Sequence, residues 1–172
     1  MKKITLFYDE MESPIGTLLL LSGGEAIVRI EYGRLADLEE KLTTWAKRFI
    51  GEPYFVYQPE LIASAKEELE AYFKHQKQTF SIPFKFYGTS FQQKVWQALY
   101  DCIAYKETKT YKEIAEIIGN PKAVRAVGGA VNKNPFSIVV PCHRVIGANG
   151  KLVGYNGGLD KKEFLLKHEA TD

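Results

Sequence analysis

The chain has 172 residues, of which 45% are hydrophobic and 26% are charged, enough for one sizeable domain or two small ones. It has no run of about 18 apolar residues, and its start alternates like a strand without a signal-peptide cleavage pattern, so neither a membrane span nor secretion is expected. Two cysteines make no disulfide framework and no Cys/His set has zinc spacing, so we expect a reducing cytosol and no metal site.

Charge is unevenly distributed along the chain. Residues 1–88 carry 11 Lys/Arg and 13 Asp/Glu, residues 89–172 carry 12 and 8, and the stretch 109–162 carries 9 and 3, a net charge of +6. A basic surface suits a polyanionic partner, because neutralising phosphates supplies most of the non-specific affinity for nucleic acid. A solvated basic surface without a partner would give the same count.

The N-terminal half predicts a small α/β domain over residues 1–88. Its expected strands span residues 4–8, 15–21 and 26–32, and its expected helices span 35–49 and 59–74. Ser22-Gly23-Gly24-Glu25 is a hairpin signal, so the three strands should form an antiparallel sheet. Pro59 suits the first position of the second helix, and nothing in this half points to chemistry of its own.

A second domain, residues 89–172, is expected to begin after Gly88 with a helix. Ser90-Phe91-Gln92-Gln93 is a capping-box signature in which Ser90 would be the N-cap. Cys102 lies within this amphipathic helix and is interpreted as a core residue.

Two short helices follow, joined by Gly119-Asn120-Pro121. Thr110 should cap the first helix, with Glu113 at its third position. Pro121 should start the second helix, which runs through Arg125 to about Val131. This is a helix-turn-helix pattern, although many helical hairpins never contact DNA.

The second of these helices is rich in small residues: Ala123, Ala126, Gly128, Gly129 and Ala130. Each helical glycine costs about 0.8–1 kcal/mol relative to alanine. Either the helix packs closely against another element with Arg125 in solvent, or it lies in a DNA groove with Arg125 as the projecting probe. The residues alone favour neither interpretation.

The stretch Ser137–Val140 predicts a strand that ends at Pro141, so that Cys142 and His143 lie just beyond the end of the strand. A thiol is a strong nucleophile only as thiolate, and a neighbouring imidazole is the group that most often deprotonates it. The alternative is a buried cysteine that acts as a small hydrophobe. A glycine-rich loop over 152–158 and a final amphipathic helix over 159–169 complete the chain.

Pro141-Cys142-His143-Arg144-Val145 resembles the active-site signature of the O6-alkylguanine-DNA alkyltransferases. Three further motifs of that family occur in the same order: Arg125–Ala130 with Asn134-Pro135, Gly154-Tyr155 with Gly157-Gly158, and Lys162-Glu163 with His168-Glu169. The resemblance is close over 89–169. It implies an α+β fold, with an N-terminal α/β domain that is ribonuclease-H-like in outline and a mainly helical C-terminal domain with a helix-turn-helix.

The resemblance also implies catalytic roles. Cys142 would accept the alkyl group in a single-turnover suicide reaction, with His143 as its base through a water and Glu169 orienting the imidazole. Asn134 would order the turn before the cysteine, and Tyr111 would donate a proton or hydrogen bond to the leaving guanine. No cofactor and no metal are implied.

The DNA contacts are implied in the same way. Arg125 would take the place of a flipped O6-alkylguanine, while Ala123, Ala126, Gly128 and Tyr111 would lie against the minor groove of double-stranded DNA. The base pocket would be formed by Tyr155, Asn156, Gly157 and Val145, where Asn156 departs from the Ser or Ala usual in the family. O6-methylguanine is the expected lesion, with O4-methylthymine as a second candidate, and a cytoplasmic monomer is expected.

Three alternatives explain less of the sequence. Alkyltransferase-like proteins, which bind lesions without removing them, lack the acceptor cysteine that this chain has. A helix-turn-helix transcription factor with an α/β sensor would leave Cys142, His143, Tyr111 and Glu169 unexplained. A Cys/His hydrolase has no oxyanion-hole or substrate-cleft signal here. The sequence therefore favours the DNA alkyltransferase.

Overall fold

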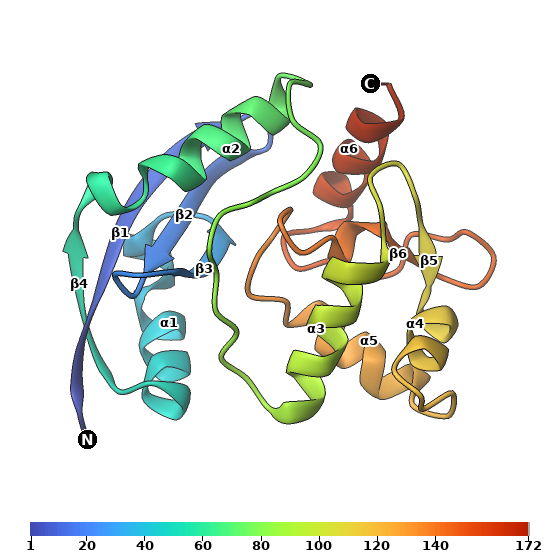
Figure 1. Ribbon diagram of the computed structural model, residues 1–172, viewed down its shortest axis with the longest axis horizontal. Coiled ribbons are helices and arrows are strands. Elements are labelled where there is room, and N and C mark those ends of the chain that lie inside the picture. Colours follow the sequence, from blue (N-terminus) through green and yellow to red (C-terminus); the bar gives the residue numbers. More distant parts are fainter. Residues whose placement is uncertain (172) are drawn as a thin grey trace. The chain divides into compact units, whose positions relative to one another are not determined.

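The computed structural model describes residues 1–171, which form two compact units (Figure 1). The first is Met1–Tyr87 and the second begins at Gly88. A strand-rich unit precedes a mainly helical one, so the predicted α+β class is confirmed. None of the described helices is long and apolar enough to cross a bilayer.

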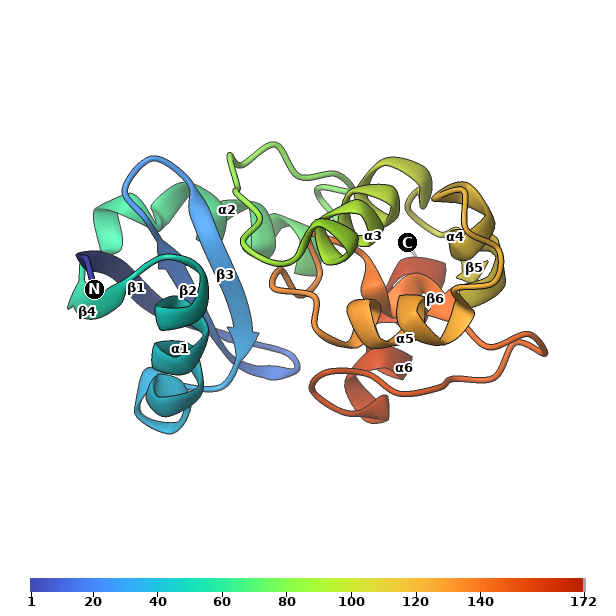
Figure 2. The same cartoon turned by 90° about the horizontal axis from the view of Figure 1, so that it is seen from below.

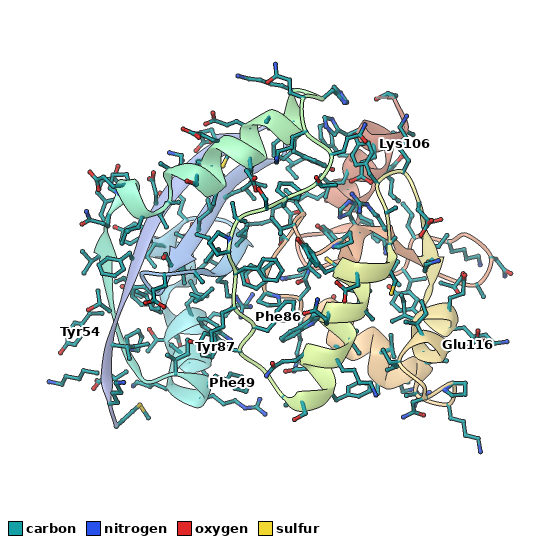
Figure 3. All side chains as sticks on the ribbon, in the orientation of Figure 1. Phe49, Tyr54, Phe86, Tyr87, Lys106 and Glu116 are labelled. Atoms are coloured by element: carbon teal, nitrogen blue, oxygen red, sulfur yellow. The ribbon has the colours of Figure 1, made fainter. Side chains whose placement is uncertain are left out.

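The first unit is built on a four-stranded sheet of order β3-β2-β1-β4. Its strands are β1 (Lys3–Ser13), β2 (Gly16–Ser22), β3 (Ile27–Tyr32) and β4 (Glu52–Tyr57). The predicted antiparallel pairing of the first three strands is confirmed, although β1 continues to Ser13 and the turn is confined to Pro14 and Ile15. The fourth strand was not predicted, and it pairs parallel with β1 at the sheet edge. Tyr54 on β4 extends outward and is 53% exposed (Figure 3).

Helices cover both faces of this sheet (Figure 2). They are α1 (Leu35–Phe49) and α2 (Ala63–Phe73), and the short 3-10 helix η1 (Pro59–Leu61) precedes α2. Leu19 and Leu21 of β2 pack in one cluster with Leu42 of α1, and alternation along the strand turns Leu18 and Leu20 to the opposite face. All four β2 leucines are fully buried. The predicted helix at Pro59 was placed too early, since Pro59 opens only the 3-10 turn.

The second unit contains four α-helices and two short strands that pair in parallel. They are α3 (Ser90–Cys102), β5 (Lys109–Thr110), α4 (Tyr111–Ile117), α5 (Val124–Asn132), the 3-10 helix η2 (Cys142–Arg144), β6 (Val145–Ile146) and α6 (Leu159–Ala170). The N-cap of α3 is Thr89, not Ser90 as predicted, because the Thr89 hydroxyl accepts from the Gln92 N–H and the Gln92 side chain accepts from the Thr89 N–H. The capping box of Thr110 and Glu113 is confirmed.

Helices α4 and α5 lie where the helix-turn-helix pair was predicted, and the turn between them is longer than predicted. The second helix begins at Val124, because Pro121 and Lys122 form a turn that closes with the Ala123 N–H on the Asn120 carbonyl. The buried face of α5 is held against α3, where the Trp96 indole donates to the Ala130 carbonyl at 2.8 Å. Its opposite face stays open to solvent.

Candidate active site

The segment before Cys142 is a buried turn, so the strand predicted over Ser137–Val140 is wrong. The Val140 N–H bonds back to the Phe136 carbonyl at 3.0 Å, and Ile138 has a φ of 75°. A β-branched residue in the left-handed region is strained, so surrounding contacts must hold the turn.

Asn134 supplies those contacts from a site that is 1% exposed. Its amide nitrogen donates to the carbonyls of Phe136 and Val140 at 3.2 and 2.8 Å, and its amide oxygen accepts from the Phe136 N–H at 3.0 Å. Buried backbone groups need hydrogen-bond partners, and here one side chain provides them in place of a neighbouring strand. Asn134 therefore orders the turn that delivers the cysteine.

Cys142 begins the 3-10 helix η2 and lies in the wall of a pocket of about 390 Å³. It is 2% exposed, yet its side chain faces a space large enough for a small ring system. Burial raises the pKa of the Cys142 thiol, against the smaller opposing effects of a hydrogen bond from Asn134, the charge of Lys162 and a hydrogen bond from Tyr155. The resting group is therefore a thiol, and a base must remove its proton when it reacts.

His143 follows Cys142 in the chain, is fully buried, and is hydrogen-bonded to Glu169 of α6. Its Nε2 lies 2.7 Å from Glu169 Oε2, and its Nδ1 has no hydrogen-bond partner among the described residues. Burial lowers the pKa of His143 more than Glu169 raises it, so the imidazole is neutral near pH 7. It can donate from Nε2 to the carboxylate and accept a proton at Nδ1.

Arg144 completes this cluster. It donates to Glu169 Oε1 from Nε at 2.8 Å and to Oε2 from Nη2 at 3.0 Å, and from Nη1 to the Ile103 carbonyl at 3.0 Å. Burial alone would raise the pKa of Glu169, but the hydrogen bonds from His143 and Arg144 and the charge of Arg144 hold it far below its usual range. Helix α6 lies beside β6 (Figure 1) and contacts η2, which brings the carboxylate to both partners.

Lys162 is a second buried cation near the pocket. Its ammonium group donates to the carbonyls of Val145, Val153 and Gly154 at 2.6, 3.1 and 3.4 Å, which ties the loop at 153–154 to the residue after η2. It also lies 5.9 Å from the ring centroid of Tyr111. Burial lowers the pKa of Lys162 and the Cys142 side chain raises it.

Tyr111, at the start of α4, lines the same pocket as Cys142. Its hydroxyl donates to the Val153 carbonyl at 3.0 Å. Burial, and then repulsion from a Cys142 thiolate, raise the pKa of Tyr111. The phenol therefore stays protonated near neutral pH and can act as a donor toward a bound molecule.

Four residues were predicted to form the pocket, and the structure brings two of them to it. Tyr155 and Asn156 line the pocket with Tyr111, Gly128, Gly129, Val131, Asn132, Cys142, Val153 and Gly154. Val145 is fully buried and is not among the lining residues, and its carbonyl accepts from Lys162. Gly157 is not among the lining residues, although its φ of 116° is one that favours glycine.

The face of α5 that points away from α3 carries the predicted DNA contacts. Arg125 and Ala126 are exposed, and Ala123 and Gly128 are partly exposed. A Cβ on Gly129 would meet nothing within 4 Å, and one on Gly128 would meet only the Tyr111 ring, at 3.9 Å. Close packing within the described part of the chain therefore does not explain these two glycines, whereas Ala130 is buried against α3.

Sequence reasoning gave no role to Arg144 or Lys162, although both lie in matched motifs. The sequence offered one signal, because Arg144 stands among mostly apolar neighbours in the chain, whereas Lys162 does not. Lys and Arg are rarely buried without partners, so a buried basic residue indicates a specific partner. Among residues 1–171 no cluster of three or more His, Cys, Asp or Glu could hold a metal ion.

Comparison with family models matches both halves of the chain. Residues 6–86 match the 6-O-methylguanine DNA methyltransferase, ribonuclease-like domain, and residues 90–171 match the 6-O-methylguanine DNA methyltransferase, DNA binding domain.

Individual proteins are similar over nearly the whole chain. The methylated-DNA–protein-cysteine methyltransferase of Methanosarcina acetivorans is 46% identical over 96% of this chain and 99% of its own. That of Haemophilus influenzae is 45% identical over 95% and 86%. Among solved structures, Mycobacterium tuberculosis OGT in complex with DNA superposes with a TM-score of 0.83 at 39% identity, covering 96% of this chain and 93% of that one.

Proposed function

This chain belongs to the 6-O-methylguanine DNA methyltransferase family, and we propose that Cys142 is the residue to which it transfers the alkyl group. The family activity is DNA repair by alkyl transfer from O6-methylguanine to a protein cysteine. The observation that carries the assignment is the position of Cys142 in the wall of the pocket that Tyr111 also lines, followed in the chain by His143, whose Nδ1 has no hydrogen-bond partner among the described residues. The other cysteine, Cys102, does not line this pocket.

The reaction is a displacement at the alkyl carbon. The Cys142 sulfur forms a bond to that carbon as the bond from carbon to guanine O6 breaks, and the guanine leaves with the electron pair. The thiol proton passes to His143 Nδ1, directly or through a water, because the raised pKa of Cys142 leaves the sulfur protonated at rest. Glu169 accepts from His143 Nε2 and stabilises the imidazolium that forms.

Tyr111 assists the leaving group. The charge that develops on the guanine needs a donor, and the Tyr111 hydroxyl is a protonated donor in the pocket. Its present partner, the Val153 carbonyl, belongs to the loop that lines the same pocket, so a bound base can replace it.

The double helix is bound through α5. A guanine inside a duplex cannot reach a sulfur that is 2% exposed, so it must leave the stack. Arg125 is exposed on the open face of α5 and can fill the vacated position, while Ala123, Ala126 and Gly128 let the helix approach the minor groove. The net charge of +6 over residues 109–162 favours this docking.

The protein acts once, as a monomer. A thioether offers no route back to the thiol here, so each chain removes one alkyl group. The acceptor must stay reduced until then, which suits the cytoplasm. We assign DNA binding and transfer to a C-terminal domain, residues 89–172, and a supporting role to an N-terminal domain, residues 1–88.

The assignment is tested by following a labelled methyl group from a duplex containing O6-methylguanine to protein. Cys142→Ser should abolish transfer while leaving affinity for the lesion duplex largely intact. The matched control Cys102→Ser removes the other thiol and should transfer at the wild-type rate. Transfer to Cys142→Ser, or its loss in Cys102→Ser alone, would refute the role of Cys142.

A further inference from the structure

Arg144 is a buried cation whose guanidinium group is held on all three nitrogens. Its side chain is 7% exposed, and each of its three guanidinium nitrogens donates to an oxygen, two on Glu169 and one on Ile103. The guanidinium also lies 5.6 Å from the ring centroid of Tyr105. Such a bidentate pair fixes both the position and the plane of the carboxylate.

The same carboxylate serves the imidazole. Glu169 Oε2 accepts from Arg144 Nη2 and lies 2.7 Å from His143 Nε2. Because a guanidinium remains charged at any pH of interest, Arg144 already balances the carboxylate. A proton added to His143 would then leave a net positive charge in a buried cluster, which is costly.

We propose that Arg144 is a positioning residue, which neutralises Glu169 and thereby holds His143 as the neutral tautomer protonated at Nε2. In this state the carboxylate accepts from Nε2, and Nδ1 keeps its lone pair for the proton of Cys142. The inference rests on the proposed role of His143 as base, and it assigns part of the control over the protonation state of that residue to a third side chain.

The charged groups around His143 agree with this assignment. Besides Glu169, the ionisable groups that act on it are Arg144 of η2 and Lys162 of α6, and both cations lower its pKa in addition to the effect of burial. Without Arg144 the pKa of His143 would rise, because only burial and Lys162 would then oppose the effect of the carboxylate. A larger share of His143 would then be imidazolium at a given pH, and that form cannot accept the proton of Cys142.

Single-turnover transfer rates measured across about pH 6–9 test the proposal. In Arg144→Met, His143 should become protonated at a higher pH than in the wild type, so the acid limb of the rate profile should shift to higher pH. Below the pKa of an essential base the rate falls about tenfold per pH unit, so this variant should lose most activity at the acid end and recover at the alkaline end. Arg144→Lys keeps the charge without the fork, so its profile should stay near the wild-type position with a lower plateau.

A surface charge provides the control. Lys167→Met likewise removes one cation, in this case from α6. Lys167 is exposed and its ion-pair partner is the exposed Glu163, so the pH profile of this variant should match that of the wild type. A uniform loss of rate in Arg144→Met, with no displacement of the acid limb, would show a merely structural role and overturn the proposal.

The wild-type protein offers a test that does not depend on folding of a variant. Nitrogen-15 NMR distinguishes the two neutral tautomers from the imidazolium, and the chain has three histidines, so His143 can be assigned by comparison with His143→Gln. We expect the neutral form protonated at Nε2 at neutral pH. An imidazolium, or a proton on Nδ1, would overturn the proposal even if Cys142 proves to be the acceptor. Methyl transfer to another residue would instead refute the proposed function and leave the tautomer measurement valid.

Discussion

Replacing Asn134 with alanine should destabilise the second unit, because one buried amide organises the turn before Cys142. Besides the hydrogen bond from Asn134 to the Cys142 side chain, the substitution removes three hydrogen bonds to the backbone of the turn, of 2.8, 3.0 and 3.2 Å. The two carbonyls involved keep a second donor each, since Phe136 O accepts from the Val140 N–H and Val140 O from the Cys142 N–H. The loss is therefore about 1 kcal/mol per bond without orphaned carbonyls, or about 3 kcal/mol in total.

Urea unfolding followed by tryptophan fluorescence measures this change. The chain has two tryptophans, Trp45 in the first unit and Trp96 in the second, so a Trp45→Phe background makes Trp96 report the second unit alone. Asn149→Ala is the matched control: it removes an amide from an exposed turn and should change stability by less than about 0.5 kcal/mol. A loss below about 1 kcal/mol for Asn134→Ala would refute the reasoning, since less than one net hydrogen bond would then be at stake.

Three further changes follow from the same geometry. Arg125→Ala should slow repair of a duplex far more than reaction with a free alkylguanine base, and equal losses would exclude a role in base flipping. Tyr111→Phe removes the donor but keeps the ring, so it should lower the transfer rate about 10²-fold or more with little change in duplex affinity; an unchanged rate would exclude leaving-group assistance. Acid should destabilise the second unit in two steps, measured as unfolding free energy against pH. The lowered pKa of His143 costs stability as pH falls below about 6.5, its unfolded value, and the lowered pKa of Glu169 costs more below about 4.3. Glu169→Gln should remove the second step, and its persistence would show that another group causes it.

Local patterns were enough to predict most elements. The α1 boundaries, the three antiparallel strands and the Thr110 cap follow from signals within a few residues of each element. The fourth strand, β4, depends on parallel pairing with β1, some fifty residues earlier in the sequence. Sequence prediction of a strand relies on apolar residues being buried on one face. In β4 the large residues Tyr54 and Tyr57 are exposed, so this pattern is absent.

The prediction of a strand before Cys142 was wrong for a different reason. A buried apolar run reads as a strand because strands are the usual way to satisfy buried backbone groups. Here the Asn134 amide satisfies them instead, and no pattern in the sequence shows which backbone groups it will reach.

The motif residues of the site were predicted by resemblance, and the structure brings Cys142, Tyr111, Tyr155 and Asn156 to one pocket. The charge arrangement behind them was not predicted. Arg144 meets Glu169 only because α6 packs on η2, and the two residues are 25 positions apart. Which carboxylate a buried arginine will neutralise depends on that packing.

The most direct test of the account is intact-mass spectrometry after incubation with an excess of O6-methylguanine duplex, followed by peptide mapping. We predict that every active chain gains one methyl group in place of the thiol proton, that the gain stops at one however large the excess, and that it maps to Cys142. Unmodified protein, continued turnover, or a methyl group on any other residue would contradict it.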